Sequence, residues 1–190
     1  MERYREILDF WFGQAAGPKL WFGASPDADR QVRERFSGDH ADAVASRLRS
    51  WEDSAQSCVA LVVLLDQFSM QLHRKQRQGY EQAALALPIA ERAIARGFDG
   101  QVTHAERGFL YMPFMHAEDR ALQDRSLELF TRLAEAMTPE ERGTLQGFLD
   151  SAKQHRDIVQ RYGRFPGRNH VFGRDNTAEE QAYLDRGGYF

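Results

Sequence analysis

The chain has one cysteine, Cys58, among its 190 residues. A single thiol can form neither an internal disulfide nor a metal site with several cysteine ligands. Because Cys58 lies in an apolar stretch, the sequence favours a packing role for it over that of a nucleophile. The phosphate-loop, dinucleotide-loop and nucleophile-elbow motifs Gly-x-x-x-x-Gly-Lys-Ser/Thr, Gly-x-Gly-x-x-Gly and Gly-x-Ser-x-Gly are absent as well, which excludes the standard forms of those enzyme classes.

Histidines and carboxylates do not occur in the spacings of common helical metal sites. There is no His-Glu-x-x-His, and none of the six histidines follows a glutamate at three residues' distance, so the di-iron bundle signature is missing. His104 and Glu106, like His116 and Glu118, are two residues apart, which places them about 200° apart around a helix. We expect no metal and no cofactor.

Long apolar runs and an excess of one charge are also missing. The longest apolar run, Val59 to Leu65, is too short to span a bilayer, and the N-terminus lacks the uninterrupted apolar segment of a signal peptide. A net charge of -3 gives no global attraction for nucleic acid. We therefore expect a cytoplasmic protein with neither nucleic acid nor membrane as a partner.

Strand signals are scarce, whereas helix signals recur along the whole chain. Capping boxes, which start helices, occur from Thr103 to Glu106, from Thr138 to Glu141 and from Thr177 to Glu180. The segment from Ser54 to His73 is apolar nearly all round, which is typical of a central helix covered by others. We expect Gly38 to interrupt the helix that starts at Pro26, and Pro88 to kink or break another.

No low-complexity linker divides the chain. The sequence therefore predicts a single domain over residues 1–190, an all-α stack of antiparallel helical hairpins.

The densest positive charge lies between His155 and Asn169, where the sequence reads HRDIVQRYGRFPGRN. Only Asp157 offers a negative charge within this run. So many guanidinium groups beside one imidazole need an anionic counterpart, either from the protein's own carboxylates or from a ligand. This run, called the arginine cluster below, contains His155, Arg156, Arg161, Arg164 and Arg168.

Asp66 lies on a packing face of the apolar central helix. A buried carboxylate must find hydrogen-bond donors or be protonated. We expect the arginine cluster to fold back against Asp66, forming a charged recess inside an apolar stack. Gln67 follows Asp66 directly, and Arg74 lies two turns further along.

Several longer stretches together resemble a known family. They are LDFWFG, WFGASPDADRQVRERF, LLDQF, ERGFLYMPFMHAED, HRDIVQRYGRFPGRN and YLDRGGYF. They resemble the bacterial domain-of-unknown-function family 924, and the resemblance implies a tetratricopeptide-like superhelix and no established activity. The chain departs from the family pattern at Ser69, Met70 and Gln71, where Pro-Arg-Asn is usual. The residues that match it are the candidate ligand-binding residues: Asp66, Gln67, Arg74, His116, Glu118, His155, Arg161, Arg164, Arg168 and Asn169.

The sequence favours a binding module as the function. Arrays of helical hairpins present concave grooves, and here an Arg/His-lined groove would bind a small anionic ligand or an acidic peptide end.

Two other functions stay open. In an enzyme acting on an anionic small molecule, His155 would be the general acid/base, oriented by Asp66 or Glu118, while Arg164 and Arg168 stabilise developing charge. The sequence supplies no nucleophile for such an enzyme, and it does not reveal the oligomeric state.

In a purely structural protein, the arginines would instead fix the last helices in place. Their partners would be Asp66, Glu106 and Glu118.

Overall fold

The computed structural model describes residues 2–13, 21 and 26–188. Every regular element in these ranges is a helix and none is a strand, which confirms the all-α prediction. Most of the WFGASP stretch and the last two residues of YLDRGGYF lie outside the described residues. The chain forms two compact units, unit 1 from Met1 to Pro113 and unit 2 from Phe114 to Phe190. The single domain and the tetratricopeptide-like superhelix remain predictions.

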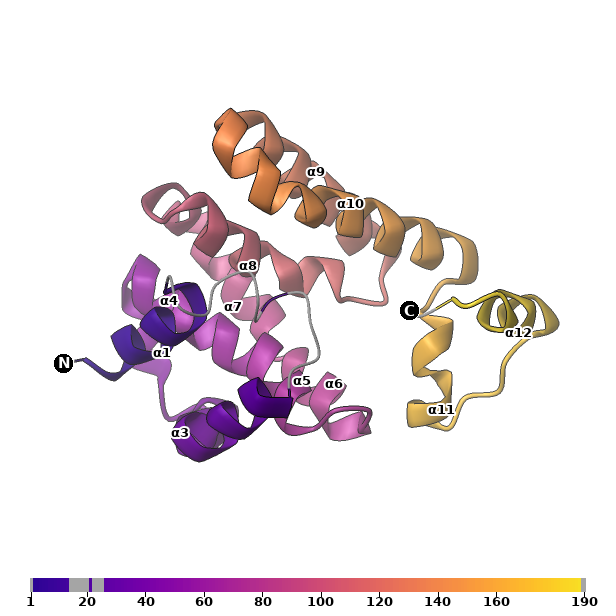
Figure 1. Cartoon of the computed structure of the whole chain (residues 1–190), viewed down its shortest axis with the longest axis horizontal. Helices are drawn as coiled ribbons and strands as arrows, with labels where there is room; N and C mark the ends of the chain where they lie inside the picture. The colour runs from indigo at the N-terminus through magenta and orange to yellow at the C-terminus, as the bar shows by residue number, and fades with distance from the viewer. Residues whose placement is uncertain (1, 14–20, 22–25, 189–190) are drawn as a thin grey trace. The chain divides into compact units, whose positions relative to one another are not determined.

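Unit 1 contains the longer series of helices (Figure 1). They are α1 (Arg3–Phe12), α3 (Pro26–Val44), the 3-10 helix η1 (Arg49–Asp53), α4 (Ala55–Val62), the π-helix η2 (Val63–Phe68), α5 (Ser69–Leu72), α6 (Arg77–Ala83), α7 (Ala86–Ala95), the 3-10 helix η3 (Phe98–Gln101) and most of α8 (His104–Met115).

Unit 2 begins within the last turn of α8. Its helices are α9 (Arg120–Ala136), α10 (Pro139–Tyr162), the 3-10 helix η4 (Pro166–Arg168), α11 (Asn169–Phe172) and α12 (Ala178–Asp185).

The predicted central helix exists as the continuous run α4, η2 and α5. Ser54 caps its start by accepting a hydrogen bond from the amide of Ser57. The 18 residues Ala55–Leu72, with a mean hydropathy of 1.3, are long and apolar enough to cross a membrane. However, 83% of this window is buried inside the protein, as in the core helix of a globular fold. The π-helical turn in its middle was not predicted.

Aromatic rings surround the central helix in unit 1. The ring of Phe68 lies edge-on to that of Trp11, with centroids 5.5 Å apart, and Trp11 meets Phe109 of α8 at the same distance. The ring of Phe36 of α3 is tilted by 32° relative to that of Phe68, with centroids 5.5 Å apart. Aromatic pairs stabilise a core beyond the apolar area that they bury, so α1 and α3 are held against the central helix and α8 is held against α1.

The helices α9 and α10 form an antiparallel hairpin in unit 2 (Figure 1). Phe130 and Phe148 pack between them with ring centroids 6.0 Å apart. The capping box of Thr138 and Glu141 starts α10, and Gly163 ends it with φ +74, donating its amide to Val159 O. The left-handed backbone at Gly163 is one that glycine adopts without strain. All three predicted capping boxes are confirmed.

The prediction that Gly38 interrupts its helix is wrong, because α3 continues through it to Val44. Phe36 and His40 on the same helix are buried, and this packing outweighs the low helix propensity of one glycine. The break predicted near Pro88 is confirmed: α6 ends at Ala83, and Pro88 lies in the first turn of α7.

Two glycines of unit 1 should respond oppositely to alanine. Nothing lies within 4 Å of the position a Cβ would take at Gly38, whereas at Gly79 it would stand 2.8 Å from His73 O and 3.2 Å from Ser69 O. We expect Gly38→Ala to raise the free energy of unfolding by up to about 1 kcal/mol. Gly79→Ala should lower it by about 1–3 kcal/mol, because α6 must move away from the end of α5. Urea unfolding of both variants measures this, and equal effects would contradict the close packing at Gly79.

Candidate functional site

Arg164, just after α10, forms a two-point ion pair with Glu180 of α12. Its Nε lies 2.7 Å from Glu180 Oε1 and its Nη2 lies 2.8 Å from Oε2. The Glu180 side chain is only 2% exposed. Hydrogen bonding from Arg164, helped by the backbone amide of Thr177, lowers the pKa of Glu180 to about 2. Glu180 is therefore ionised at neutral pH and fully engaged by the protein's own groups.

Other arginines of the cluster also have partners within unit 2. Arg161 Nη2 lies 2.5 Å from Glu179 Oε1, and both side chains are more than half exposed. Arg156 Nε lies 2.6 Å from Asp124 Oδ1 on α9. These carboxylate partners come from α9 and α12, and they were not among the carboxylates that the sequence suggested.

Glu118 serves as an acceptor for the turn after α10. It takes two hydrogen bonds from Arg174, at 2.6 and 2.9 Å, and one of 2.9 Å from the amide of Phe165. Burial alone would raise its pKa, but the hydrogen bonds from Arg174 and from Phe165 outweigh burial, and the pKa of Glu118 is lowered. Arg174 was not among the predicted site residues.

His155 is 5% exposed, and its Nδ1 lies 2.7 Å from Ser151 O. Because a carbonyl can only accept, Nδ1 carries the hydrogen. Burial, followed by the field of His116, whose ring centroid lies 6.0 Å away, lowers the pKa of His155 to about 3. His155 is therefore neutral at physiological pH.

The sequence suggested that Glu118 could orient His155 as a general acid/base. In the structure the Glu118 carboxylate instead accepts hydrogen bonds from Arg174 and from the Phe165 amide. Glu106, a predicted structural partner of the arginines, accepts the Thr103 amide at 2.8 Å in its capping box.

Arg168 and Asn169 follow in the turn at η4. Arg168 Nη1 donates to His116 O at 2.9 Å, and its guanidinium lies 4.2 Å from the ring centroid of Phe165. Asn169 is 1% exposed and donates to Asn176 Oδ1 at 2.8 Å. These contacts tie the turn to the end of α8 and to the segment before α12.

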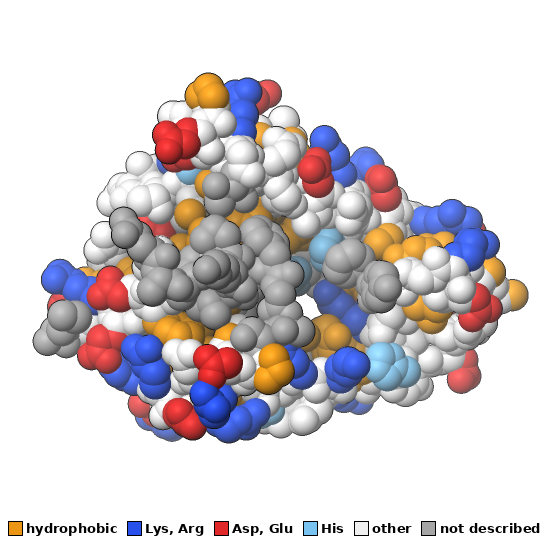
Figure 2. Space-filling model, viewed as in Figure 1, with side chains coloured by type: hydrophobic (Ala, Val, Ile, Leu, Met, Phe, Trp, Pro, Cys, Tyr) orange, Lys and Arg blue, Asp and Glu red, His pale blue; other side chains and the backbone are white. Residues whose placement is uncertain are grey.

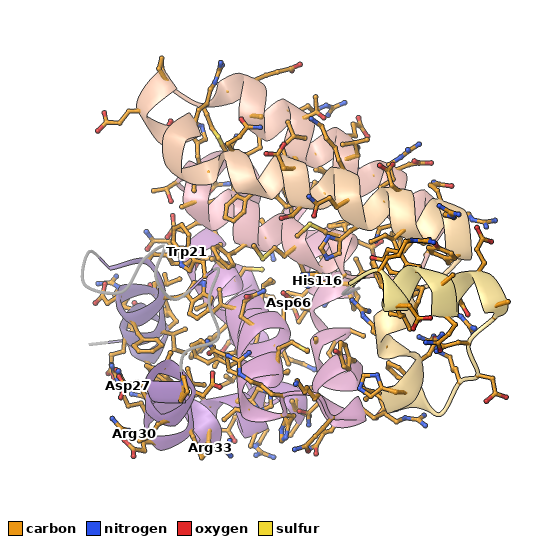
Figure 3. The ribbon with its side chains drawn as sticks, turned by 45° about the vertical axis from the view of Figure 1, so that its right-hand side comes forward. Trp21, Asp27, Arg30, Arg33, Asp66 and His116 are labelled. Atoms are coloured by element: carbon orange, nitrogen blue, oxygen red, sulfur yellow. The ribbon has the colours of Figure 1, made fainter. Side chains whose placement is uncertain are left out.

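The other predicted site residues lie in unit 1. Asp66, on the π-helix η2 and labelled in Figure 3, is 1% exposed and accepts a hydrogen bond from Gln67. Gln67 Nε2 also lies 3.2 Å from Met112 Sδ. Arg74 is paired with Asp29 of α3, through an Nη2–Oδ1 contact of 2.6 Å. The approach of the arginine cluster to Asp66 remains a prediction.

Unit 1 also contains a groove that the sequence did not indicate. It has a volume of about 360 Å³ and lies between α3, the end of α5 and α6. We call it the histidine groove, after His40 and His73. Its lining residues are Arg33, Ser37, His40, Ala41, Val44, Ala45, Leu72, His73, Gln78 and Gln82.

The two histidines of this groove differ in burial. His40 is 4% exposed, and its Nε2 lies 2.8 Å from Ser69 Oγ. Burial, followed by the nearby His73, lowers the pKa of His40 to about 4. His73 is partly exposed, with its ring centroid 5.9 Å from that of His40. Burial and then the charge of Arg33 lower the pKa of His73.

Arg33 carries the permanent charge of the groove and is labelled on α3 in Figure 3. Its Nη2 donates to Leu72 O at 3.3 Å, and within the described part of the chain it forms no ion pair. None of the described residues that line the groove carries a carboxylate. By contrast Arg30, one turn earlier, pairs with Asp27. The groove therefore combines an unneutralised cation with two imidazoles, an arrangement that suits an anion.

The described residues give no indication of a metal site or of a nucleic-acid interface. Among the described residues there is no group of three or more His, Cys, Asp or Glu side chains that could hold a metal ion. On the face in view in Figure 2, basic and acidic side chains are interspersed, without the single-sign stripe of a nucleic-acid-binding surface.

Comparison with known proteins gives a family match and a matching structure. The family described as "Bacterial protein of unknown function (DUF924)" matches residues 7–188. A solved structure of a protein of unknown function from Agrobacterium tumefaciens is similar, with 38% sequence identity, a TM-score of 0.86 and coverage of 97% of each chain. No curated protein matches the chain.

Arg164→Gln should destabilise the protein in a pH-dependent way. The lowered pKa of Glu180 contributes stability that is present above its ordinary value of 4.5 and is lost as the pH falls towards about 2. At neutral pH we expect a loss on the order of 2 kcal/mol, because the substitution leaves a buried charge without its main partner.

The difference from wild type should shrink as the pH falls below about 4.5. Arg161→Gln is the matched control, since its pair with Glu179 is exposed and should contribute less than about 1 kcal/mol. Urea unfolding at several pH values measures both. Equal losses in the two variants would contradict a special role for the buried pair.

Proposed function

The chain belongs to the DUF924 family of bacterial proteins, and we propose that it binds a small anionic ligand in the histidine groove of unit 1. The observation that supports this proposal is the guanidinium of Arg33, which lines a groove whose other described lining residues include no carboxylate. The volume of about 360 Å³ lies at the small end of the range for ligand sites, which is about 300–1,000 Å³.

The binding module indicated by the sequence is kept in this proposal, but its place in the chain changes. Arg161 and Arg164 are paired with the carboxylates of α12, and Arg74 is paired with Asp29. Arginines neutralised in this way offer less attraction to an external anion than Arg33 does. For Arg161 and Arg164, a structural role is the better supported one.

A catalytic role for His155 receives less support than binding. Its Nδ1–H is committed to Ser151 O, and its lowered pKa leaves it without a proton to donate as an imidazolium at neutral pH. The cytoplasmic location expected from the sequence is part of the proposal, as is the absence of nucleic acid among its partners.

The experiment is a thermal-shift screen with acetate, butyrate, phosphate and sulfate, followed by calorimetric titration of any anion that raises Tm. We expect Arg33→Gln to weaken binding at least about tenfold, because a charge-assisted hydrogen bond contributes about 1.5–3 kcal/mol. Arg30→Gln, which changes an arginine of the same helix that already pairs with Asp27, should bind within about twofold of wild type.

Two results would overturn the proposal. One is the absence of a Tm shift with every anion at millimolar concentration. The other is an Arg33→Gln variant that binds like wild type, because the anion would then occupy another place in the chain.

A further inference from the structure

The charge of the histidine groove suits a ligand with one negative charge. Of the lining residues that the structure describes, Arg33 alone is always charged. His40, with a pKa of about 4, is neutral at physiological pH. A phosphate group carries about 1.5–2 negative charges and three acceptor oxygens, and it would bring more charge than Arg33 can neutralise. A carboxylate carries one charge and two oxygens in the planar arrangement that a guanidinium matches.

Four of the side chains that α3 contributes to the groove lie along one side of the helix. Arg33, Ser37, Ala41 and Val44 are spaced by four, four and three residues, so they lie along one side of the helix. From Arg33 to Val44 the helix rises about 16 Å. The wall that α3 contributes to the groove is therefore polar near Arg33 and Ser37 and apolar near Val44 and Ala45.

From this polarity we infer that the ligand is a monocarboxylate with a short aliphatic chain. Its carboxylate lies between Arg33 and His73, and its chain extends along Ala41 towards Val44. This inference rests on the proposed function, because it names the class of anion that the same groove binds.

The same geometry couples binding to a proton. Among the described lining residues, only His73 can gain a charge near neutral pH. On α3, His40 is too deeply buried and Arg33 is already charged. On α6, Gln78 and Gln82 carry no charge. The positive charge of Arg33 helps to keep the pKa of His73 below its ordinary 6.5, and burial contributes more. A bound carboxylate offsets the repulsion from Arg33, so the pKa of His73 rises and the complex takes up a proton.

The first experiment compares acetate, propionate and butyrate with phosphate and with the uncharged butyramide by calorimetric titration of the full chain. Each added methylene should tighten binding about three- to fourfold as it enters the apolar end. Phosphate and butyramide should bind at least about tenfold more weakly than butyrate. Equal affinity along the carboxylate series, or tighter binding of phosphate, overturns the ligand class while the anion-binding function stands.

The second experiment measures proton uptake, by titrating butyrate in two buffers of different ionisation enthalpy between about pH 6 and pH 8. We expect uptake of a fraction of a proton per butyrate and tighter binding as the pH falls. His73→Gln should abolish the uptake, and His170→Gln, which changes an exposed histidine on α11, should leave it unchanged.

Zero uptake by the wild-type protein overturns the role of His73, and this measurement does not depend on whether the His73→Gln variant folds. Wild-type binding of butyrate by Arg33→Gln overturns both the ligand class and the proposed function.

Discussion

The C-terminal part of unit 2 depends on the ion pair between Arg164 and the almost completely buried carboxylate of Glu180. A carboxylate keeps its charge in such surroundings only when donors surround it. Arg164, the Thr177 amide and Asn169 supply these donors, and they join the end of α10, the turn at η4 and the start of α12. Arg33 is the opposite case, because its positive charge faces a groove in which no described lining residue is a carboxylate.

Features that depend on neighbouring residues could be predicted from the sequence. The capping boxes at Thr138 and Thr177 need only residues three positions apart, and the all-round apolar character of the central helix indicates that other helices cover it. Gly38 shows where such reasoning fails. A glycine reduces helix stability by about 1 kcal/mol, and the burial of neighbouring α3 residues more than compensates.

The arginine cluster could be found from the sequence, but its partners could not. Glu179 and Glu180 lie more than ten residues after the arginines they bind, and Glu118 precedes its partner Arg174 by 56 residues. Choosing among the chain's many carboxylates requires the packing of α9, α10 and α12. The histidine groove was missed for the same reason, because His40 and His73 are brought together only when α3 packs against α5.

The π-helix η2 changes what can be read from helical periodicity in the middle of unit 1. Its hydrogen bonds span five residues instead of four, so the turn holds one extra residue. Each later side chain is therefore rotated by about 100° from where an uninterrupted α-helix would direct it. Ser69 is the first residue after this turn, and its hydroxyl meets His40. Deleting one residue from Val63–Phe68 would convert this stretch to uninterrupted α-helix and leave Ser69 facing α3. If the present sequence were held as uninterrupted α-helix instead, Ser69 would turn away from α3 and the wall that α5 contributes to the groove would be taken apart.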